Sequence, residues 1–321
     1  MSGDEIFRRE LRQRMSGEIL FDEPAERHTS IGVGGPIDAL LFPEDTIEIK
    51  EIVHFLRGRQ VPFLPVGNWT NLIVRDGGFR GALISLARLS GLSLREKGKE
   101  GVLLLAGAGC PLSELTSLAV REALTGMEFC AGIPGSVGGA IRMNAGAYGG
   151  EIKDIIESAI LLDTSGVTRS AVREELHFTY RNLDLPAETI IIGATFLLRR
   201  GDGKRIVEHV RKNIEIRREK HPLEFRNAGS IFKNPRDCPA GRLIDESGLR
   251  GARIGDAQIS EKHGNFIVNR GRATAEEILR LIALVQQRVF ERTGHALETE
   301  VKIVGESRMI GGSADGLRIR L

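Results

Sequence analysis

The chain has 321 residues, of which 41% are hydrophobic and 27% charged, and its formal net charge is only +2. This length is enough for two or three packed lobes, and the near balance of charge argues against a nucleic acid or a membrane as the partner. No run approaches the ~18–20 apolar residues of a membrane span, and the charged N-terminus lacks the apolar core of a signal peptide. We therefore expect a soluble cytoplasmic protein with no obligate protein partner. Its unpaired cysteines are expected to be reduced structural thiols: Cys110, Cys130 and Cys238.

The predicted elements begin with a charged helix at the N-terminus and then alternate strand and helix. Apolar residues recur with helical spacing through 46–60. Short apolar runs on either side of this helix predict strands: 37–42, 63–66 and 81–86. The alternation is typical of a small α/β lobe, and we assign residues 1–87 to a first lobe.

The middle of the chain, residues 88–218, predicts a second lobe. Its strands and helices are expected, in chain order, at 102–106, 111–124, 155–163, 189–198 and 204–220.

The pattern changes again near residue 219 and predicts a smaller domain that ends at 306. Its helix, strand, helix and closing strand are expected at 239–247, 265–268, 274–293 and 301–304. The long helix begins with a capping box of Thr274 and Glu277 and stops at Gly294. The tail, 307–321, has little to bury and is expected to be loose.

The stretch 132–150 contains seven glycines in nineteen residues. Glycine loses the most backbone entropy on ordering, so we expect neither a stable helix nor a good strand here. A nest of backbone N–H groups that binds anionic oxygens fits better. The alternative, a solvated linker, leaves Ile133 and Val137 unexplained.

Two further glycine-rich loops, 32–35 and 67–71, stand apart from this stretch. None of the three follows the strand–GxGxxG–helix pattern, and the chain has no GxxxxGK[ST] motif. Several loops that converge on one long cofactor, such as a flavin dinucleotide, fit better than a Rossmann unit or a P-loop.

Other chemistries find no support. The seven histidines show no metal-ligand spacing, so no metal site is expected. The segment around Ser136 lacks the GxSxG pattern of serine hydrolases. Ser230, which follows a flexible Ala-Gly pair, and Glu300, before the closing strand, are candidates that are structural more often than not when each is considered alone.

Taken together, five stretches in the same order resemble UDP-N-acetylenolpyruvoylglucosamine reductases, from about His28 to Glu306. They are GIPGSVGGAIRMNAGAYGGE, Tyr180-Arg181, NAGSIFKNP, RLIDESGL and LETEVKIVGE. The resemblance implies an α+β fold, with a two-lobed FAD-binding domain of the vanillyl-alcohol-oxidase type followed by an α+β substrate-binding domain. The short spacing from Arg181 to Ser230 is similar to the smaller subclass, which lacks a substrate-capping insertion.

The resemblance also implies the chemistry, which is reduction of a C=C bond in peptidoglycan synthesis. NADPH would reduce non-covalently bound FAD, and the flavin would then pass hydride to UDP-N-acetylglucosamine enolpyruvate to give UDP-N-acetylmuramate. The two substrates would use one pocket in turn. By position, Ser230 matches the family's proton donor, Arg181 its active-site arginine and Glu300 its active-site glutamate. An arginine fork suits the substrate carboxylate, and a serine hydroxyl can protonate a carbanion-like centre.

The remaining site residues follow from the same resemblance. Lys220, Asn234 and His263 match positions along the uridine diphosphate, and Tyr148 is a candidate to cover the substrate. The expected FAD contacts are Gly67, Asn68, Thr70, Asn71, Gly132, Ile133, Pro134, Gly135, Ser136, Gly139, Asn144 and Gly146.

One loop departs from the family pattern, because Asn68-Trp69 stands where successive glycines are usual. Asn68 tolerates a left-handed backbone and Trp69 does so poorly. Either the loop differs locally or the indole lies against the cofactor; packing of the indole on a neighbouring lobe is equally expected. Two other functions stay open from the residues alone: a different flavoenzyme on the same scaffold, an oxidase of sugars or hydroxy acids, and a non-enzymatic flavin- or nucleotide-binding protein.

Overall fold

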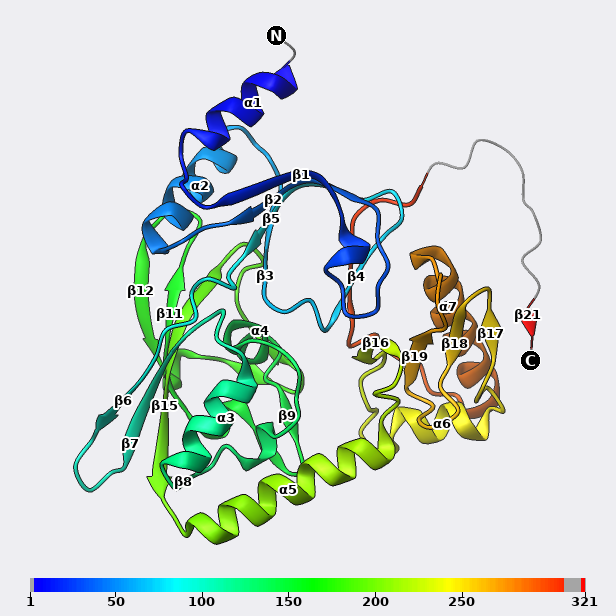
Figure 1. The fold of residues 1–321 in the computed structure, drawn as a ribbon. Helices are drawn as coiled ribbons and strands as arrows, with labels where there is room; N and C mark the ends of the chain where they lie inside the picture. Colours follow the sequence, from blue (N-terminus) through cyan, green and yellow to red (C-terminus); the bar gives the residue numbers. More distant parts are fainter. Residues whose placement is uncertain (1–2, 309–318, 321) are drawn as a thin grey trace. The chain divides into compact units, whose positions relative to one another are not determined.

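The structure is a computed structural model that describes residues 3–308 and 319–320 (Figure 1). The chain forms two compact units, each built from three segments. Unit 1 consists of residues 1–21, 39–68 and 81–216, and unit 2 of residues 22–38, 69–80 and 217–321. Both units combine helices with sheets, which confirms the α+β class. The predicted domain limits at 87, 218 and 306 stay a prediction.

Unit 1 is built around a large antiparallel sheet with strand order β12-β11-β15-β7-β6, in which β8 also pairs with β15. Its strands are β6 (Leu92–Glu96), β7 (Val102–Gly107), β8 (Leu124–Thr125), β11 (Ile156–Leu162), β12 (Thr168–Val172) and β15 (Ile190–Arg200). The long strand β15 is almost wholly buried over its first nine residues, as expected of a central strand.

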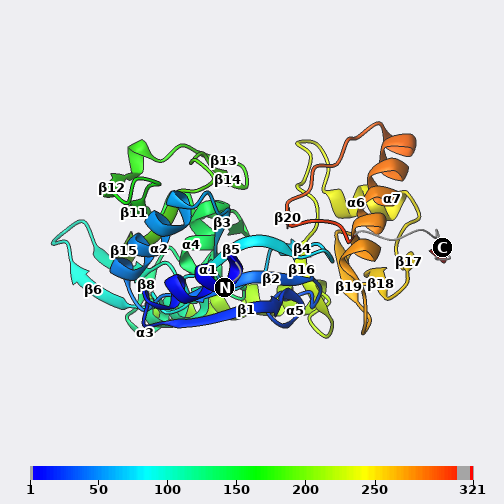
Figure 2. The same ribbon diagram turned by 90° about the horizontal axis from the view of Figure 1, so that it is seen from above.

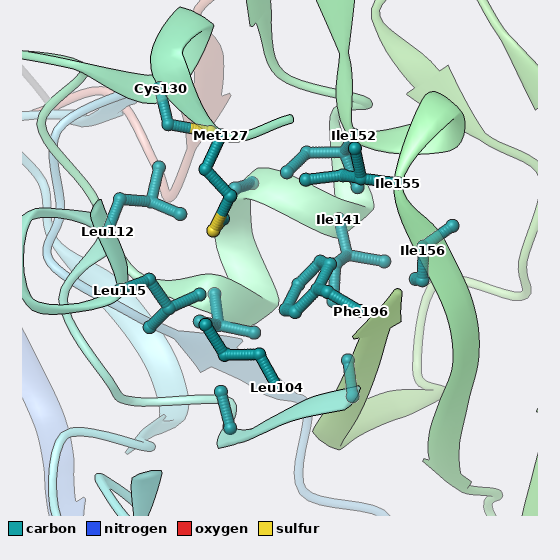
Figure 3. Packing of buried hydrophobic residues seen from close by; sticks show 14 of the residues in the cluster. Leu104, Leu112, Leu115, Met127, Cys130, Ile141, Ile152, Ile155, Ile156 and Phe196 are labelled. Atoms are coloured by element: carbon teal, nitrogen blue, oxygen red, sulfur yellow. The ribbon is translucent and has the colours of Figure 1, made fainter. Parts of the chain in front are cut away.

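The core of unit 1 lies where helix α4 (Val137–Arg142) packs on β15 and β7. Figure 3 shows Ile141 of α4 beside Phe196 of β15, both fully buried, with Leu104 of β7 below them. Helix α3 (Leu112–Arg121) adds Leu112 and Leu115 to the same cluster. The glycine-rich stretch is thereby anchored on the sheet.

A second sheet has strand order β1-β2-β5-β3. Its strands and the nearby helices are α1 (Gly3–Arg12), β1 (Glu18–Pro24), β2 (Pro36–Phe42), α2 (Thr46–Gly58), β3 (Phe63–Val66) and β5 (Phe79–Ser85). Asp45 caps α2, because its carboxylate accepts hydrogen bonds from the first free amides of the helix. The apolar residues that predicted this helix, such as Ile49 and Ile52, are fully buried.

Unit 2 contains an antiparallel sheet of order β16-β19-β18-β17-β21, with α6 and α7 packed together against it (Figure 2). Its elements are β16 (Arg226–Ser230), α6 (Ala240–Glu246), β17 (Arg253–Ile254), β18 (Ala257–Ile259), β19 (Phe266–Asn269), α7 (Ala275–Thr293) and β21 (Ile319–Arg320). The predicted capping box of Thr274 and Glu277 is confirmed, as is the stop at Gly294, whose φ is +75°. The predicted loose tail falls largely outside the described residues.

The remaining elements are short, apart from helix α5, which begins in unit 1 and ends in unit 2. They are η1 (Ala25–Arg27), β4 (Leu72–Val74), η2 (Glu128–Cys130), β9 (Gly146–Ala147), β10 (Gly150–Glu151), η3 (Ile152–Asp154), η4 (Arg173–Glu175), β13 (Phe178–Thr179), β14 (Asn182–Leu183), α5 (Gly203–Lys220) and β20 (Lys302–Val304).

Candidate flavin and substrate site

The glycine-rich stretch does contain a helix, so the prediction that it forms none was wrong. Helix α4 passes through Gly138 and Gly139. A Cβ at Gly138 would lie 3.0 Å from the Cβ of Ala108, so glycine is what allows this close packing. Because Val137 and Ile141 are fully buried, tertiary packing stabilises a helix that propensity disfavours.

Two of the predicted FAD loops meet inside unit 1. A Cβ at Gly67 would lie 2.0 Å from the Oγ atom of Ser136, so any side chain at residue 67 would collide with the start of α4. Ser136 is 2% exposed, and its hydroxyl has no hydrogen-bond partner among the described residues. Burying a hydroxyl without a partner costs free energy, so this atom fits a site that a polar cofactor completes.

The other predicted contacts in this stretch differ in exposure. Gly132, Pro134 and Gly139 are exposed, which leaves their backbone accessible to a ligand; Ile133, Gly135 and Gly146 are half-buried. The side chain of Asn144, by contrast, is fully buried and bonded to protein groups on three sides. Any contact of Asn144 with FAD would therefore use its backbone.

Arg181 lies at the tip of a two-residue hairpin between β13 and β14. Its φ is +55°, a left-handed conformation that is uncommon for a residue other than glycine. The guanidinium lies 5.4 Å from the centre of the Tyr180 ring, within the range of a cation–π contact.

Trp69 takes a left-handed backbone conformation, with φ at +57°, whereas Asn68 does not. Trp69 therefore adopts the conformation that its residue type disfavours, and the local surroundings give the reason. The indole is 8% exposed and lies 5.4 Å from the ring of His28, and the backbone carbonyl of Trp69 accepts a hydrogen bond from Ser30. Packing therefore holds the loop in a conformation that the residue type disfavours.

Ser230 ends strand β16, opposite Phe266 of β19. The pairing is interrupted between Asn227 and Ser230, and Gly229 has a φ of +76°. This irregularity is typical of a β-bulge, which re-aims a side chain. Ser230 is half-buried, and its hydroxyl has no hydrogen-bond partner within the described part of the chain.

Glu300 lies beside the residue that follows Ser230 in unit 2, because its backbone N–H donates to the carbonyl of Ile231 at 2.8 Å. Its own carbonyl accepts a hydrogen bond from the side chain of Asn71 at 3.1 Å. Residue 71 leads directly into β4, which pairs in parallel with β20. Two of the three predicted catalytic residues are thus brought together with a predicted FAD contact; Arg181 belongs to the other unit.

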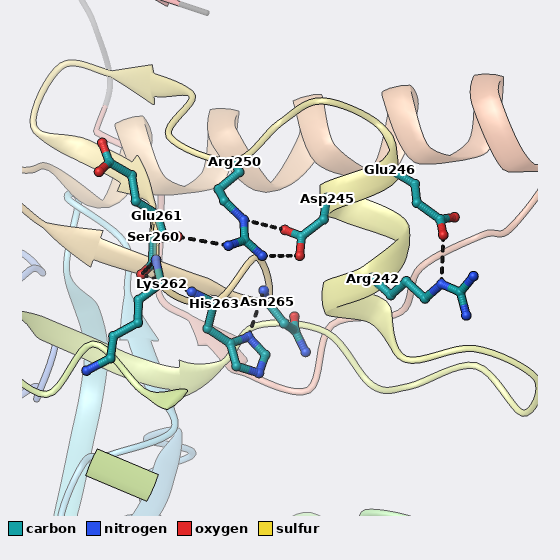
Figure 4. Close-up of polar contacts among 9 residues, drawn as sticks. All are labelled: Arg242, Asp245, Glu246, Arg250, Ser260, Glu261, Lys262, His263 and Asn265. Carbon is teal, nitrogen blue, oxygen red and sulfur yellow. Dashed lines mark hydrogen bonds and ion pairs between the residues drawn. The ribbon is translucent and has the colours of Figure 1, made fainter. Parts of the chain in front are cut away.

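The predicted uridine diphosphate residues also lie in unit 2. Lys220 is exposed at the C-terminal end of α5, and the side-chain oxygen of Asn234 accepts a hydrogen bond from Ala240 at the start of α6. The Nδ1 atom of His263 accepts a hydrogen bond from the backbone N–H of Asn265 at 3.1 Å (Figure 4). Burial lowers the pKa of His263, and a neutral ring that accepts at Nδ1 presents an N–H donor at Nε2.

Arg250 holds the segment that carries His263. It forms an ion pair with Asp245 of α6 and donates to the carbonyl of Glu261 at 3.0 Å (Figure 4). The rigid placement of a neutral N–H donor suits recognition of a phosphate or carbonyl oxygen.

Tyr148, the candidate to cover the substrate, is exposed, and its hydroxyl donates to the backbone carbonyl of Asn213 in α5 at 3.0 Å. The side chain of Asn213 in turn donates to the carbonyl of Glu128. The structure therefore gives Tyr148 a role in anchoring the glycine-rich stretch to α5.

Asn265 is a supporting residue that sequence reasoning missed. It is 4% exposed, and its side chain both accepts from the N–H of Phe232 and donates to its carbonyl, at 2.9 and 2.8 Å. These two hydrogen bonds hold the backbone of Phe232, two residues after Ser230. The sequence feature that could have revealed Asn265 is an amide side chain directly before the apolar residues of a predicted strand.

Over the described residues, no group of three or more His, Cys, Asp or Glu side chains is arranged to hold a metal ion. The same residues include no helix long and apolar enough to cross a membrane.

Comparison with known protein families first gives the class. Residues 37–171 match an FAD binding domain, the region that holds Gly67, Ser136 and α4. The chain is therefore an FAD-dependent oxidoreductase, as the fold and the glycine-rich site indicate. Residues 221–304 match the C-terminal domain of UDP-N-acetylenolpyruvoylglucosamine reductase, which includes Ser230 and Glu300.

Whole-chain relatives then give the family. The chain is 49% identical to UDP-N-acetylenolpyruvoylglucosamine reductase of Syntrophus aciditrophicus, over 94% of this chain and 97% of the relative. The enzyme of that name from Geobacter sulfurreducens is 47% identical over 92% of this chain and 97% of its own length. A crystal structure of the Thermus caldophilus enzyme superimposes with a TM-score of 0.74, at 34% identity, over 90% of this chain and 99% of that one. The chain belongs to the UDP-N-acetylenolpyruvoylglucosamine reductase family.

Proposed function

We propose that this protein reduces the enolpyruvyl double bond of UDP-N-acetylglucosamine enolpyruvate to give UDP-N-acetylmuramate for peptidoglycan, with NADPH as the hydride donor. The observation that carries the proposal is the pairing of an FAD binding domain with a domain in which the backbone of Glu300 is bonded to Ile231, the residue after Ser230. FAD, when bound, supplies hydride transfer between NADPH and the substrate. Since a nucleotide sugar and NADPH are both cytoplasmic metabolites, we place the reaction in the cytoplasm.

In this proposal residues of the chain bind the substrate carboxylate and donate the proton that completes the reduction. Arg181 binds the substrate carboxylate, where a planar fork matches two oxygens. The Ser230 hydroxyl donates its proton to the carbon next to that carboxylate, and the described residues offer it no hydrogen-bond partner that would compete. Glu300 orients or polarises the enolate-like group from the neighbouring strand.

Substrate recognition is assigned to the surface that includes Lys220, Asn234 and His263. Phosphate and uracil oxygens accept hydrogen bonds from groups of this kind, which are the ammonium group of Lys220 and the neutral N–H donor of His263. The FAD diphosphate is assigned to the backbone of the loop at Gly67 and of residues 132–139, where glycine lets main-chain amides approach anionic oxygens.

Replacement of the proposed proton donor separates the two half-reactions. Ser230→Ala is expected to retain FAD and its reduction by NADPH, and to lose about 10²–10⁴-fold in turnover, because only the second half-reaction needs the proton. Stopped-flow absorbance of the flavin measures each half-reaction. Ser247→Ala, which removes a hydroxyl bonded to the backbone of α6, is the matched control and should turn over normally. Equal activity of Ser230→Ala and the control would contradict the assignment.

A further inference from the structure

The hairpin that carries Arg181 is held by residues outside the hairpin. Its strands pair Thr179 with Asn182, which leaves only Tyr180 and Arg181 in the turn. Because Arg181 has a φ of +55°, the turn conformation is one that an isolated chain would rarely adopt. Surrounding contacts must therefore maintain it.

Asn144 makes the contact that reaches this turn. Its Nδ2 group donates to the carbonyl of Thr179 and to the Oε2 atom of Glu151, each at 3.0 Å. Its Oδ1 atom accepts from the backbone N–H of Lys153 at 3.1 Å. With 0% exposure, Asn144 has every polar atom of its side chain committed to the protein, and one of these bonds ends on the residue before the turn.

Glu151 extends the contact electrostatically. Its carboxylate accepts from Asn144 and forms an ion pair with Lys153 at 2.6 Å. Burial pushes the pKa of Glu151 upward, but these two partners and the positive charges of Lys153 and Arg181 bring it below its ordinary value. The Glu151 carboxylate is thus bonded to the same side-chain amide that binds Thr179, and the charge of Arg181 is among those that favour its ionised form.

Asn144 belongs to the glycine-rich stretch that we assign to FAD, two residues after α4, and Glu151 directly follows that stretch. We propose that Asn144 and Glu151 are positioning residues that tie the Arg181 hairpin to the FAD-binding segment, so that the flavin loop and the arginine that binds the substrate carboxylate form one rigid piece. This inference rests on the proposed function, in which Arg181 binds that carboxylate. Glu151 acts through Arg181 and Asn144 acts through the turn; neither touches substrate in this scheme.

The test compares two ligands titrated into the FAD-loaded enzyme, with the flavin absorbance change as the signal. UDP-N-acetylglucosamine enolpyruvate carries the carboxylate, and UDP-N-acetylglucosamine does not. Glu151→Gln is expected to raise Kd for the first about tenfold, within the range of coupling between contacting residues, and to leave Kd for the second and the FAD content unchanged. Glu157→Gln is the matched control, because Glu157 also pairs with a lysine in unit 1, and the polar contact that the described residues give it, to Lys97, does not involve the hairpin. It should bind both ligands as the parent does.

A double-variant cycle with Arg181→Met gives the sharper result. If Glu151 acts through Arg181, Glu151→Gln should weaken substrate binding no further once Arg181 is replaced. Additive effects, or equal losses for both ligands, would overturn the positioning role. Arg181→Met without effect on either ligand would overturn the role of Arg181 in the proposed function, and this inference with it. If Glu151→Gln fails to retain FAD, Asn144→Ala replaces it in the double-variant cycle with Arg181→Met, because Asn144 binds the carbonyl of Thr179 directly.

Discussion

Four non-glycine residues of the site region take left-handed backbone conformations: Trp69, Asn144, Tyr148 and Arg181. Such a conformation costs about 1–2 kcal/mol per residue outside glycine. For Trp69 and Arg181 a neighbour outside the loop stabilises this conformation: His28 packs on the Trp69 indole, and Asn144 binds the strand before Arg181. A sequence pattern cannot reveal this, because the cause is a contact between distant residues, whereas the residue types that do the chemistry could be identified by their motifs.

His221 is the residue for which the structure predicts a pH effect. Its ring packs against His263 and Phe266, and burial together with the nearby charges of Arg217, Lys262 and Lys220 lowers its pKa from 6.5 to about 4. The folded state therefore stays unprotonated where the unfolded state takes up a proton. We expect the free energy of unfolding to fall as the pH drops from 6.5 to about 4.

Chemical denaturation at a series of pH values measures this effect. His221→Phe should reduce the slope between pH 6.5 and 4, because one group that titrates differently in the two states is gone, while His263, whose pKa burial also lowers, remains. His54→Gln, at an exposed position on α2, is the control and should keep the parent slope. The same slope in His221→Phe as in the parent would contradict the assignment.

At the scale of elements, the sequence predicted the periodic helices and the apolar strands well, including short ones such as α6 and β3, and it missed α4 and the two-residue strands. The capping box at Thr274 and the helical spacing of apolar residues in α2 are local patterns. Helices α7 and α2 therefore begin and end close to their predicted limits. Helix α4 was missed because its stability comes from buried contacts with β7 and β15 rather than from helix propensity. The β13–β14 hairpin has only two residues in each strand, too few for any periodic signal.

Gly138 tests the packing of α4. Gly138→Val is expected to lower the free energy of unfolding by about 1–3 kcal/mol, because a side chain there is forced against Ala108. Gly58→Ala is the comparison in helix α2, where an added Cβ meets nothing within 4 Å. It should be neutral or stabilise by up to about 1 kcal/mol. Urea unfolding of the two variants measures the difference, and equal effects would show that α4 is not closely packed.

At the scale of the whole molecule, the order of motifs along the chain was enough to predict the family, the cofactor and the α+β class. The assembly of the units was not predictable in the same way. Unit 2 combines residues 22–38 and 69–80 with the C-terminal part of the chain, and the parallel pairing of β4 with β20 joins residues more than two hundred positions apart. Such non-local pairing depends on tertiary contacts that no local pattern records.

The central claim is that one flavin takes hydride from NADPH and delivers it to the enolpyruvyl sugar nucleotide. An anaerobic stopped-flow trace at ~450 nm, the band of oxidised flavin in this class of cofactor, tests it most directly. NADPH should bleach the purified holoenzyme, and UDP-N-acetylglucosamine enolpyruvate added next should restore the colour without oxygen. Bleaching with no recovery would contradict the assigned substrate, and a protein that cannot be reconstituted with FAD would contradict the assigned cofactor.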